Sequence, residues 1–163
     1  APLKNGGSAG TQTLGHLMAD HGKDHARATV NFRRALELDP SLLSAKFSLA
    51  RSLKATGERE EAARLLDELI QEDPTAIQAV IELAQLHSEA GRVMEGLTLL
   101  ETALQQNPNS GYLAYNAGSF AATLKEPARA ETHLRRALAI AEAEQDAQLF
   151  QASAALLRSI GQP

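Results

Sequence analysis

A step of 34 residues recurs along the chain. Pro40, Pro74 and Pro108 follow one another at 74 − 40 = 34 and 108 − 74 = 34 residues, and each comes directly after an Asp or an Asn. The stretch Phe-Arg-Arg-Ala-Leu at 32–36 resembles Leu-Arg-Arg-Ala-Leu at 134–138, three such steps later. Self-similarity at a fixed period of this length is the signature of a repeat architecture, so the chain is predicted to be an array of similar units.

Apolar residues keep the same step. One column holds small residues and a second, four positions later, holds large ones, so both lie on one face of a helix. The small column is Ala28, Ala62, Gly96 and Ala130, and the large column is Phe32, Leu66, Leu100 and Leu134. Aromatic residues make up only 4% of the chain and Trp is absent, so the core is built from Ala and Leu, which favours close-packed helices over a β-sandwich.

Each period is predicted to form two helices. The first runs over 43–56 and ends at Gly57, because glycine adopts the left-handed conformation without a Cβ clash. The second runs over 58–72 and stops at Asp73, because the residue before Pro74 disfavours helix. A helix of ~14 residues cannot bury its apolar stripe alone, so neighbouring pairs are expected to stack. The next copy predicts helices over 77–90 and 93–106.

The period, the small residue four before a large one, and the closing Asp-Pro resemble the tetratricopeptide repeat (TPR) family over roughly residues 9–142. The resemblance implies an all-α fold, an α-α superhelix (TPR solenoid) of about four helix-turn-helix repeats plus a C-terminal capping helix. The expected organisation is a flexible N-terminal segment or linker at 1–10 and a TPR domain at 11–163, with repeats at about 9–42, 43–76, 77–110 and 111–144 and a capping helix at 145–160.

The copies depart from the pattern at both ends. Lys125 stands where a third turn glycine would fall, and Glu142 stands where the fourth copy would have its proline. The first copy is the weakest, with Gly15 and His16 at positions that favour Leu and a small residue. The last helix is expected to cover the final repeat with one apolar face, as solenoids require at their ends. That face holds Leu149, Phe150, Leu156, Leu157 and Ile160.

The resemblance also implies that the first helix of each pair lines a concave peptide-binding groove. The implied groove residues are Ser44, Phe47, Ser48, Arg51, Lys54, Gln78, Ile81, Glu82, Gln85, Glu89, Tyr112, Tyr115, Asn116 and Ser119. Both tyrosines of the chain are in this set, and Tyr offers an apolar ring with a hydrogen-bonding tip. Asn116 offers a donor and an acceptor for a peptide backbone, or bonds locally to its own helix. Phe47 and Ile81 belong to the core instead if the facing is rotated by one position.

Charged groove residues bear on the ligand. Arg51 and Lys54 suit a ligand carboxylate, whereas Glu82 and Glu89 repel one. The TPR domains that hold chaperone C-termini use several Lys, Arg and Asn in a two-carboxylate clamp, and here only Arg51 and Asn116 suit that role. A chaperone tail is therefore not the expected ligand.

Composition argues against several other functions. A net charge of −4 opposes nucleic-acid binding, and no apolar run approaches the ~20 residues that span a bilayer. The absence of Cys removes disulfides, thiolate zinc sites and Cys nucleophiles. His16, His21 and His25 cluster near a predicted turn, which a polar surface explains without a metal. No catalytic motif stands out, so no cofactor and no metal are expected.

We therefore expect a non-enzymatic scaffold or adaptor that binds a peptide segment of a protein partner. Two alternatives stay open: a recruiting TPR arm of a larger multidomain enzyme, and a self-assembling TPR protein. The second would form a homo-oligomer through the first repeat, where Leu14, Leu17 and Met18 are apolar. The identity of the partner stays open, and a cytoplasmic and a bacterial periplasmic location are equally compatible with the sequence.

Overall fold

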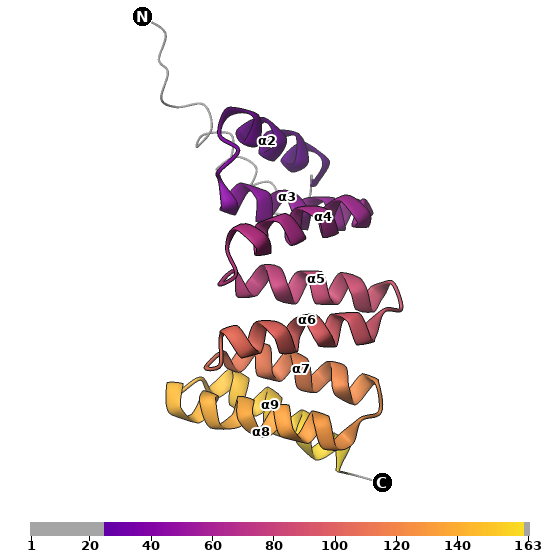
Figure 1. Ribbon diagram of the computed structural model, residues 1–163, viewed down its shortest axis with the longest axis vertical. Coiled ribbons are helices and arrows are strands. Elements are labelled where there is room, and N and C mark those ends of the chain that lie inside the picture. The colour runs from indigo at the N-terminus through magenta and orange to yellow at the C-terminus, as the bar shows by residue number, and fades with distance from the viewer. Residues whose placement is uncertain (1–24, 162–163) are drawn as a thin grey trace, which may run out of the picture. The chain divides into compact units, whose positions relative to one another are not determined.

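The computed structural model of the protein describes residues 25–161, and this part of the chain is all-α, with eight helices and no strand (Figure 1). The described residues form two compact units, 25–73 and 74–161. The first unit contains α2 (His25–Leu38), α3 (Leu43–Thr56) and α4 (Arg59–Glu72). The second contains α5 (Ile77–Glu89), α6 (Val93–Gln106), α7 (Gly111–Thr123), α8 (Pro127–Glu144) and α9 (Ala147–Ile160).

The helices end where the sequence predicts. Gly57 and Gly91 have φ angles of +93° and +78°, the left-handed conformation that a side chain opposes. Asp73 and Asn107, each before a proline, have φ angles of −135° and −123° and lie outside the helical region. The predicted turn chemistry is therefore confirmed in the second and third periods.

The fourth period keeps the turn but loses the stop. Lys125 adopts φ +59° and so forms the left-handed turn without a glycine. Because no proline follows its second helix, α8 continues to Glu144 and reaches 18 residues, compared with 14 in α6. Gln145, with φ +58°, then ends it. α8 is thus about one turn longer than α6.

In the first unit, α3 packs against both α2 and α4. The small-residue column fulfils its predicted role here, because Ala28 and Ala62 are fully buried. Arg33 on α2 and Glu61 on α4 form an ion pair of 2.8 Å at the surface of this core. The core is made by Ala28, Phe32, Ala35, Ala45, Leu49, Leu53, Ala62, Leu66 and Leu69, with smaller neighbours.

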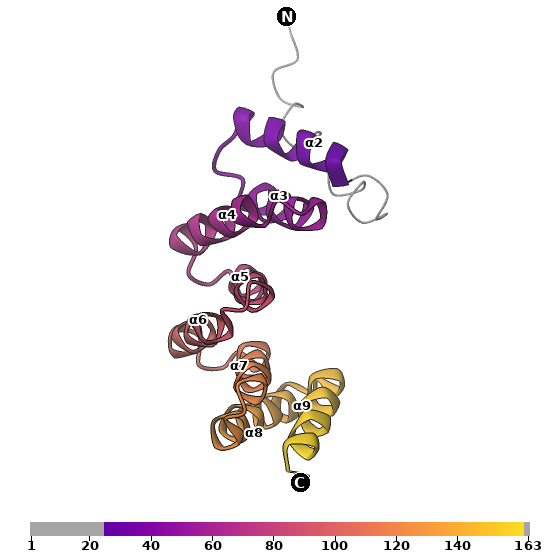
Figure 2. The same ribbon diagram turned by 90° about the vertical axis from the view of Figure 1, so that its right-hand side faces the viewer.

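In the second unit each helix packs against the next, and Figure 2 shows α5 and α7 on one side with α6 and α8 on the other. The small-residue positions allow this close approach. A Cβ at Gly96 would lie 2.8 Å from the carbonyl oxygen of Ala84 and 2.6 Å from Cε1 of Phe120. A Cβ at Gly118 would lie 2.7 Å from Cγ of Leu134. Glycine is therefore required at both contacts.

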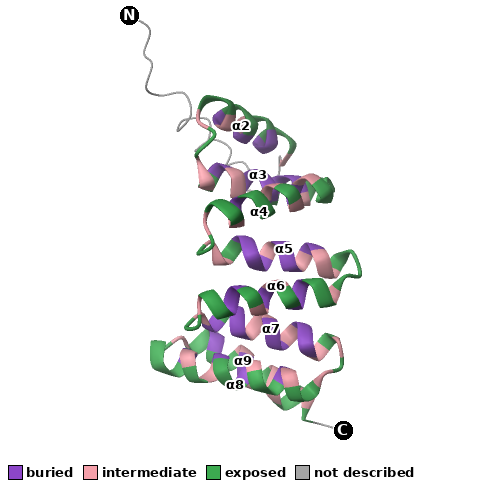
Figure 3. Cartoon of the chain, in the orientation of Figure 1, coloured by how far each residue is buried: buried purple, intermediate pink, exposed green. Residues whose placement is uncertain are grey.

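Burial differs between the first and second helices of a pair, as the colours of Figure 3 show. In the second unit, α7 buries seven of its 13 residues, whereas α8 buries four of its 18. The exposed residues of α5 and α7 therefore form narrow stripes on otherwise buried helices. Within residues 25–161, no helix combines the length and apolar character that crossing a bilayer requires.

Candidate peptide-binding surface

In the first unit, four of the five groove residues predicted on α3 are at least partly exposed. Ser44 and Arg51 are exposed, and Phe47 and Lys54 are partly buried. Cζ of Arg51 lies 6.0 Å from the centre of the Phe47 ring, at the outer limit of a cation–π contact. The guanidinium group thus covers part of the aromatic face and keeps its charge at the surface.

Two predicted groove residues are buried, which corrects the sequence prediction. Ser48 is 7% exposed and Ile81 is 9% exposed, so neither offers an accessible side chain. Ile81 thereby follows the alternative in which the facing is rotated by one position. Ser48 lies on α3, which packs against α2 and α4, and Ile81 lies on α5, which packs against α6 and contacts α7.

In the second unit, the four other residues predicted on α5 are at least partly exposed, in contrast to Ile81. Gln78 and Glu89 are exposed, whereas Glu82 and Gln85 are partly buried. Neither α5 nor α7 contains a Lys or an Arg. The acidic side chains of these two helices are Glu82 and Glu89, both on α5, which also carries His87.

The predicted residues of α7 lie within three turns of one another. Tyr112 is 46% exposed, and Tyr115, Asn116 and Ser119 are partly buried. Nδ2 of Asn116 donates a 2.8 Å hydrogen bond to the backbone oxygen of Tyr112. The local interpretation of Asn116 is therefore the one observed.

Tyr112 also connects α7 to the start of α9. Its hydroxyl donates a 2.8 Å hydrogen bond to Oδ2 of Asp146, while Oδ1 accepts 2.9 Å from the backbone N–H of Leu149 and so caps α9. Hydrogen bonds lower the pKa of Asp146: the largest effect comes from the backbone N–H of Leu149 and the next from the hydroxyl of Tyr112. The same carboxylate raises the pKa of Tyr112 through the hydroxyl bond.

The partners Tyr112 and Asp146 are 34 residues apart, so α9 starts in the register of a first helix one period on. In that register Phe150 follows Asn116 by 150 − 116 = 34 residues. Phe150 is 41% exposed, which corrects the prediction that it packs on the last repeat; Leu149, 2% exposed, packs there instead. The sequence reasoning missed Phe150 as a surface residue, although continuing the groove column by one period would have found it.

Clefts surround the turn between α8 and α9. One of about 490 Å³ lies between the loop at Pro108 and Asn109 and the end of α8 at Glu144, and Tyr112 lines it. A second cleft, also of about 490 Å³, shares Pro108, Asn109 and Glu144 with the first and extends to Arg136. Nη2 of Arg136 donates a 2.6 Å hydrogen bond to the backbone oxygen of Pro108. A third of about 170 Å³ is lined by Ala141, Glu142, Gln145, Asp146, Ala147 and Phe150.

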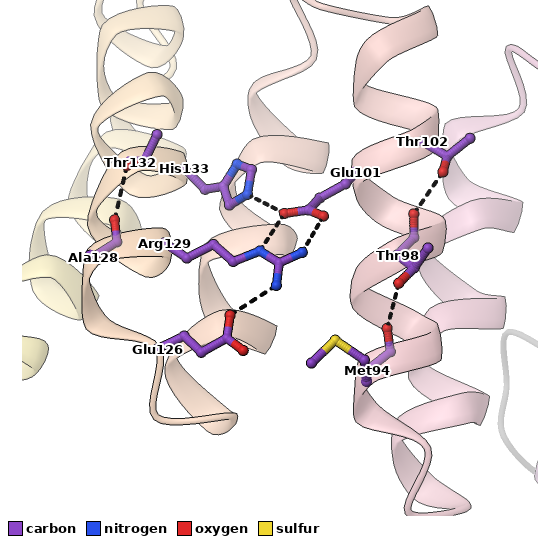
Figure 4. Close-up of polar contacts among 9 residues, drawn as sticks. All are labelled: Met94, Thr98, Glu101, Thr102, Glu126, Ala128, Arg129, Thr132 and His133. Carbon is purple, nitrogen blue, oxygen red and sulfur yellow. Dashed lines mark hydrogen bonds and ion pairs between the residues drawn. The ribbon is translucent and has the colours of Figure 1, made fainter.

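The second helices of this unit carry a polar cluster with a structural role (Figure 4). Glu101 on α6 accepts bonds of 2.8 and 2.5 Å from Nε and Nη2 of Arg129 on α8, and one contact of 2.8 Å from Nε2 of His133. Arg129 also pairs with Glu126 at 2.9 Å. The guanidinium of Arg129 holds the pKa of Glu101 below its usual range. The cluster therefore joins α6 to α8.

Comparison with known proteins identifies the family of this chain. The model of the tetratricopeptide repeat family matches residues 21–76 and 57–114, more than half of the chain. The protein belongs to the TPR family. No curated protein matches its sequence. The predicted residues before 25, including His16, His21 and the apolar Leu14, Leu17 and Met18, lie outside the described part of this TPR chain.

Solved TPR structures resemble the chain. A thermophilic TPR protein from Thermus thermophilus is 25% identical, with a TM-score of 0.72 over 94% of this chain and 83% of that one. PilF of Pseudomonas aeruginosa is 19% identical, with a TM-score of 0.69 over 99% and 80%. A TPR protein from Parabacteroides merdae is 18% identical, with a TM-score of 0.75 over 94% and 60%. TPR domains are generally non-enzymatic scaffolds for protein–protein interaction, and membership of the family supports that class of function.

Proposed function

We propose that this TPR protein is a non-enzymatic scaffold that binds a peptide segment of a partner through the first-helix face of its repeats. The observation that carries the proposal is the grouping of Tyr112, Tyr115 and Asn116 on one side of α7. Tyr112 is 46% exposed, and the other two are partly accessible. Tyr rings bury a large area at low entropic cost, which is why they are frequent at interfaces.

Amide and hydroxyl side chains support a peptide as the ligand. Gln78 and Gln85 on α5, with Asn116 and Ser119 on α7, supply donors and acceptors on the two first helices of the second unit. An extended peptide carries one N–H and one C=O per residue and needs partners for both. Arg51 and Lys54 of the first unit supply cationic positions on α3 of that unit.

The test is affinity capture with crosslinking from a lysate of the source organism, with the wild-type protein and two variants. Tyr115→Ala removes a ring from the proposed face. Met94→Ala is the matched control, because Met94 is 46% exposed on α6, a second helix. We expect the wild type and Met94→Ala to capture the same partner, and Tyr115→Ala to lose it while circular dichroism shows an unchanged fold.

Retention of the partner by Tyr115→Ala would overturn the assignment of this face. Loss of the partner by both variants would also count against it, because a binding face on the first helices is not affected by truncating Met94. Truncating one central interface aromatic weakens binding by about 2 kcal/mol or more, which is roughly 30-fold and sufficient to abolish capture of a micromolar partner.

A further inference from the structure

The surface around the turn between α8 and α9 combines exposed aromatic rings, clefts and carboxylates. We define this turn surface by Tyr112, Glu142, Glu144, Asp146 and Phe150. We infer that the turn surface docks a basic peptide segment, in which an Arg or Lys stands beside an apolar side chain. This inference goes beyond the proposed function, because the turn surface shares only Tyr112 with the proposed peptide-binding face.

The aromatic residues provide the docking area. Tyr112 and Phe150 are 46% and 41% exposed, and each borders a cleft, of about 490 and 170 Å³ respectively. Asp146 connects them, because it accepts the Tyr112 hydroxyl and begins the helix that carries Phe150. Exposed apolar side chains beside a hollow are typical of a surface that a partner covers.

The charge of the turn surface selects the occupant. Glu142, Glu144 and Asp146 lie within five residues at the C-terminus of α8, where the helix dipole adds further negative potential. The last turn of α8 contains no basic residue. Arg136 is the cation that borders these clefts, and its Nη2 is engaged with the Pro108 oxygen. A cationic side chain at this surface would be attracted both by the negative charge of the carboxylates and by the faces of the aromatic rings.

The same charge disfavours other occupants. Phosphate groups of nucleic acids and anionic lipids would be repelled by the three carboxylates. A second copy of the chain, docked through the same patch, would bring the carboxylates of both copies together, because a two-fold interface pairs identical patches. A basic peptide segment is the occupant that satisfies both the rings and the charges.

The turn surface exists because the fourth period lacks its proline. In the two preceding periods the second helix stops at Asp73 and Asn107, and the corresponding position in the fourth is 107 + 34 = 141. Because α8 continues past Ala141 to Glu144, it carries Glu142 and Glu144 beyond that point and forms one wall of the clefts. The departure from the repeat pattern is thus what builds the surface.

The experiment selects peptides from a random dodecapeptide display library on the full-length protein. Each enriched peptide is then synthesised, and its affinity is measured by fluorescence anisotropy. The test variants are the double variant Glu142→Gln/Glu144→Gln and the single variant Phe150→Ala. The controls are Glu131→Gln, an exposed carboxylate earlier on α8 that pairs with Arg135, and Met94→Ala, an exposed apolar residue on α6. Tyr115→Ala is measured beside them to identify peptides that bind the proposed peptide-binding face instead.

We expect enriched peptides to carry Arg or Lys next to an apolar residue. Their binding should weaken about tenfold or more in each test variant, weaken with added salt, and stay unchanged in both controls. The inference is overturned if no peptide is enriched, if the enriched peptides have no excess of basic residues, or if the test variants bind as the wild type does. Peptides that lose affinity only in Tyr115→Ala would support the peptide-binding face and overturn the turn surface. Thermal melts of every variant verify that the fold is retained.

Discussion

The hydroxyl of Tyr112 donates a 2.8 Å hydrogen bond to the carboxylate of Asp146, one repeat period further along the chain. The same carboxylate caps α9 through the backbone N–H of Leu149. The Asp146 carboxylate thus links α7 to the start of α9 and holds an exposed tyrosine side chain. It couples the packing of the last helix to the surface proposed to bind peptides.

Asp146→Ala should destabilise the protein more than Tyr112→Phe, because it removes the helix cap as well as the hydroxyl bond. The folded-state pKa of Asp146 is lowered, so its contribution is present above the unfolded Asp pKa of ~3.9 and is lost as pH falls through the folded value. Urea titrations at pH 7 and pH 3 provide the measurement. The gap between wild type and Asp146→Ala should narrow at pH 3, and an equal gap at both pH values would contradict this account.

Arg129→Ala should lower the free energy of unfolding by about 1 kcal/mol, because it leaves Glu101 partly buried without its main partner. The control Arg135→Ala breaks an exposed pair with Glu131 and should cost less than ~0.5 kcal/mol. Because the folded-state pKa of Glu101 is lowered, the contribution of Arg129 is present above the unfolded Glu pKa of ~4.3 and is lost as pH falls through the folded value. If both variants lost the same free energy of unfolding at pH 7, the bonds between Arg129 and Glu101 would contribute no more than an exposed ion pair does.

Gly96→Ala should destabilise the second unit by about 1–3 kcal/mol, because the new Cβ meets the backbone oxygen of Ala84. At an exposed helical site the same exchange would stabilise by up to ~1 kcal/mol, so the sign of the change reports the close contact of α5 and α6. Thr98→Ala, an exposed change on the same helix, serves as the control. Chemical denaturation followed by circular dichroism gives the values, and a stabilised Gly96→Ala would refute the packing.

Lys125→Gly should stabilise the protein by about 0.5–1 kcal/mol, because Lys125 has a φ of +59° that glycine adopts without strain. Gly91→Ala, the opposite exchange in the same column, should destabilise by about 1 kcal/mol. The larger flexibility of glycine in the unfolded chain offsets part of the first gain. Opposite signs in parallel urea titrations are the expected outcome, and a loss of stability in Lys125→Gly would show that its side chain contributes more than its backbone costs.

Part of the candidate peptide-binding surface can be predicted from the sequence. The period places Tyr112, Tyr115 and Asn116 on α7, where the first is exposed and the other two are partly buried. It misassigned Ser48 and Ile81, because a helical face read from spacing is uncertain by one position and each position turns the side chain by about 100°. Phe150 was missed because an apolar residue on a terminal helix is as consistent with packing as with exposure.

The amino-acid sequence by itself determined the repeat length, the helix ends and the fold class. These depend on local chemistry: a glycine that permits positive φ at 57 and 91, and prolines that end the helices before them. Only the tertiary structure decided which side chains are accessible, that Tyr112 bonds to Asp146, and that the extra turn of α8 forms the walls of clefts. The physical reason is that burial and long-range hydrogen bonds depend on how the helices pack against one another. The local sequence pattern predicts the helices, but it would be the same if two helices lay a few ångströms further apart.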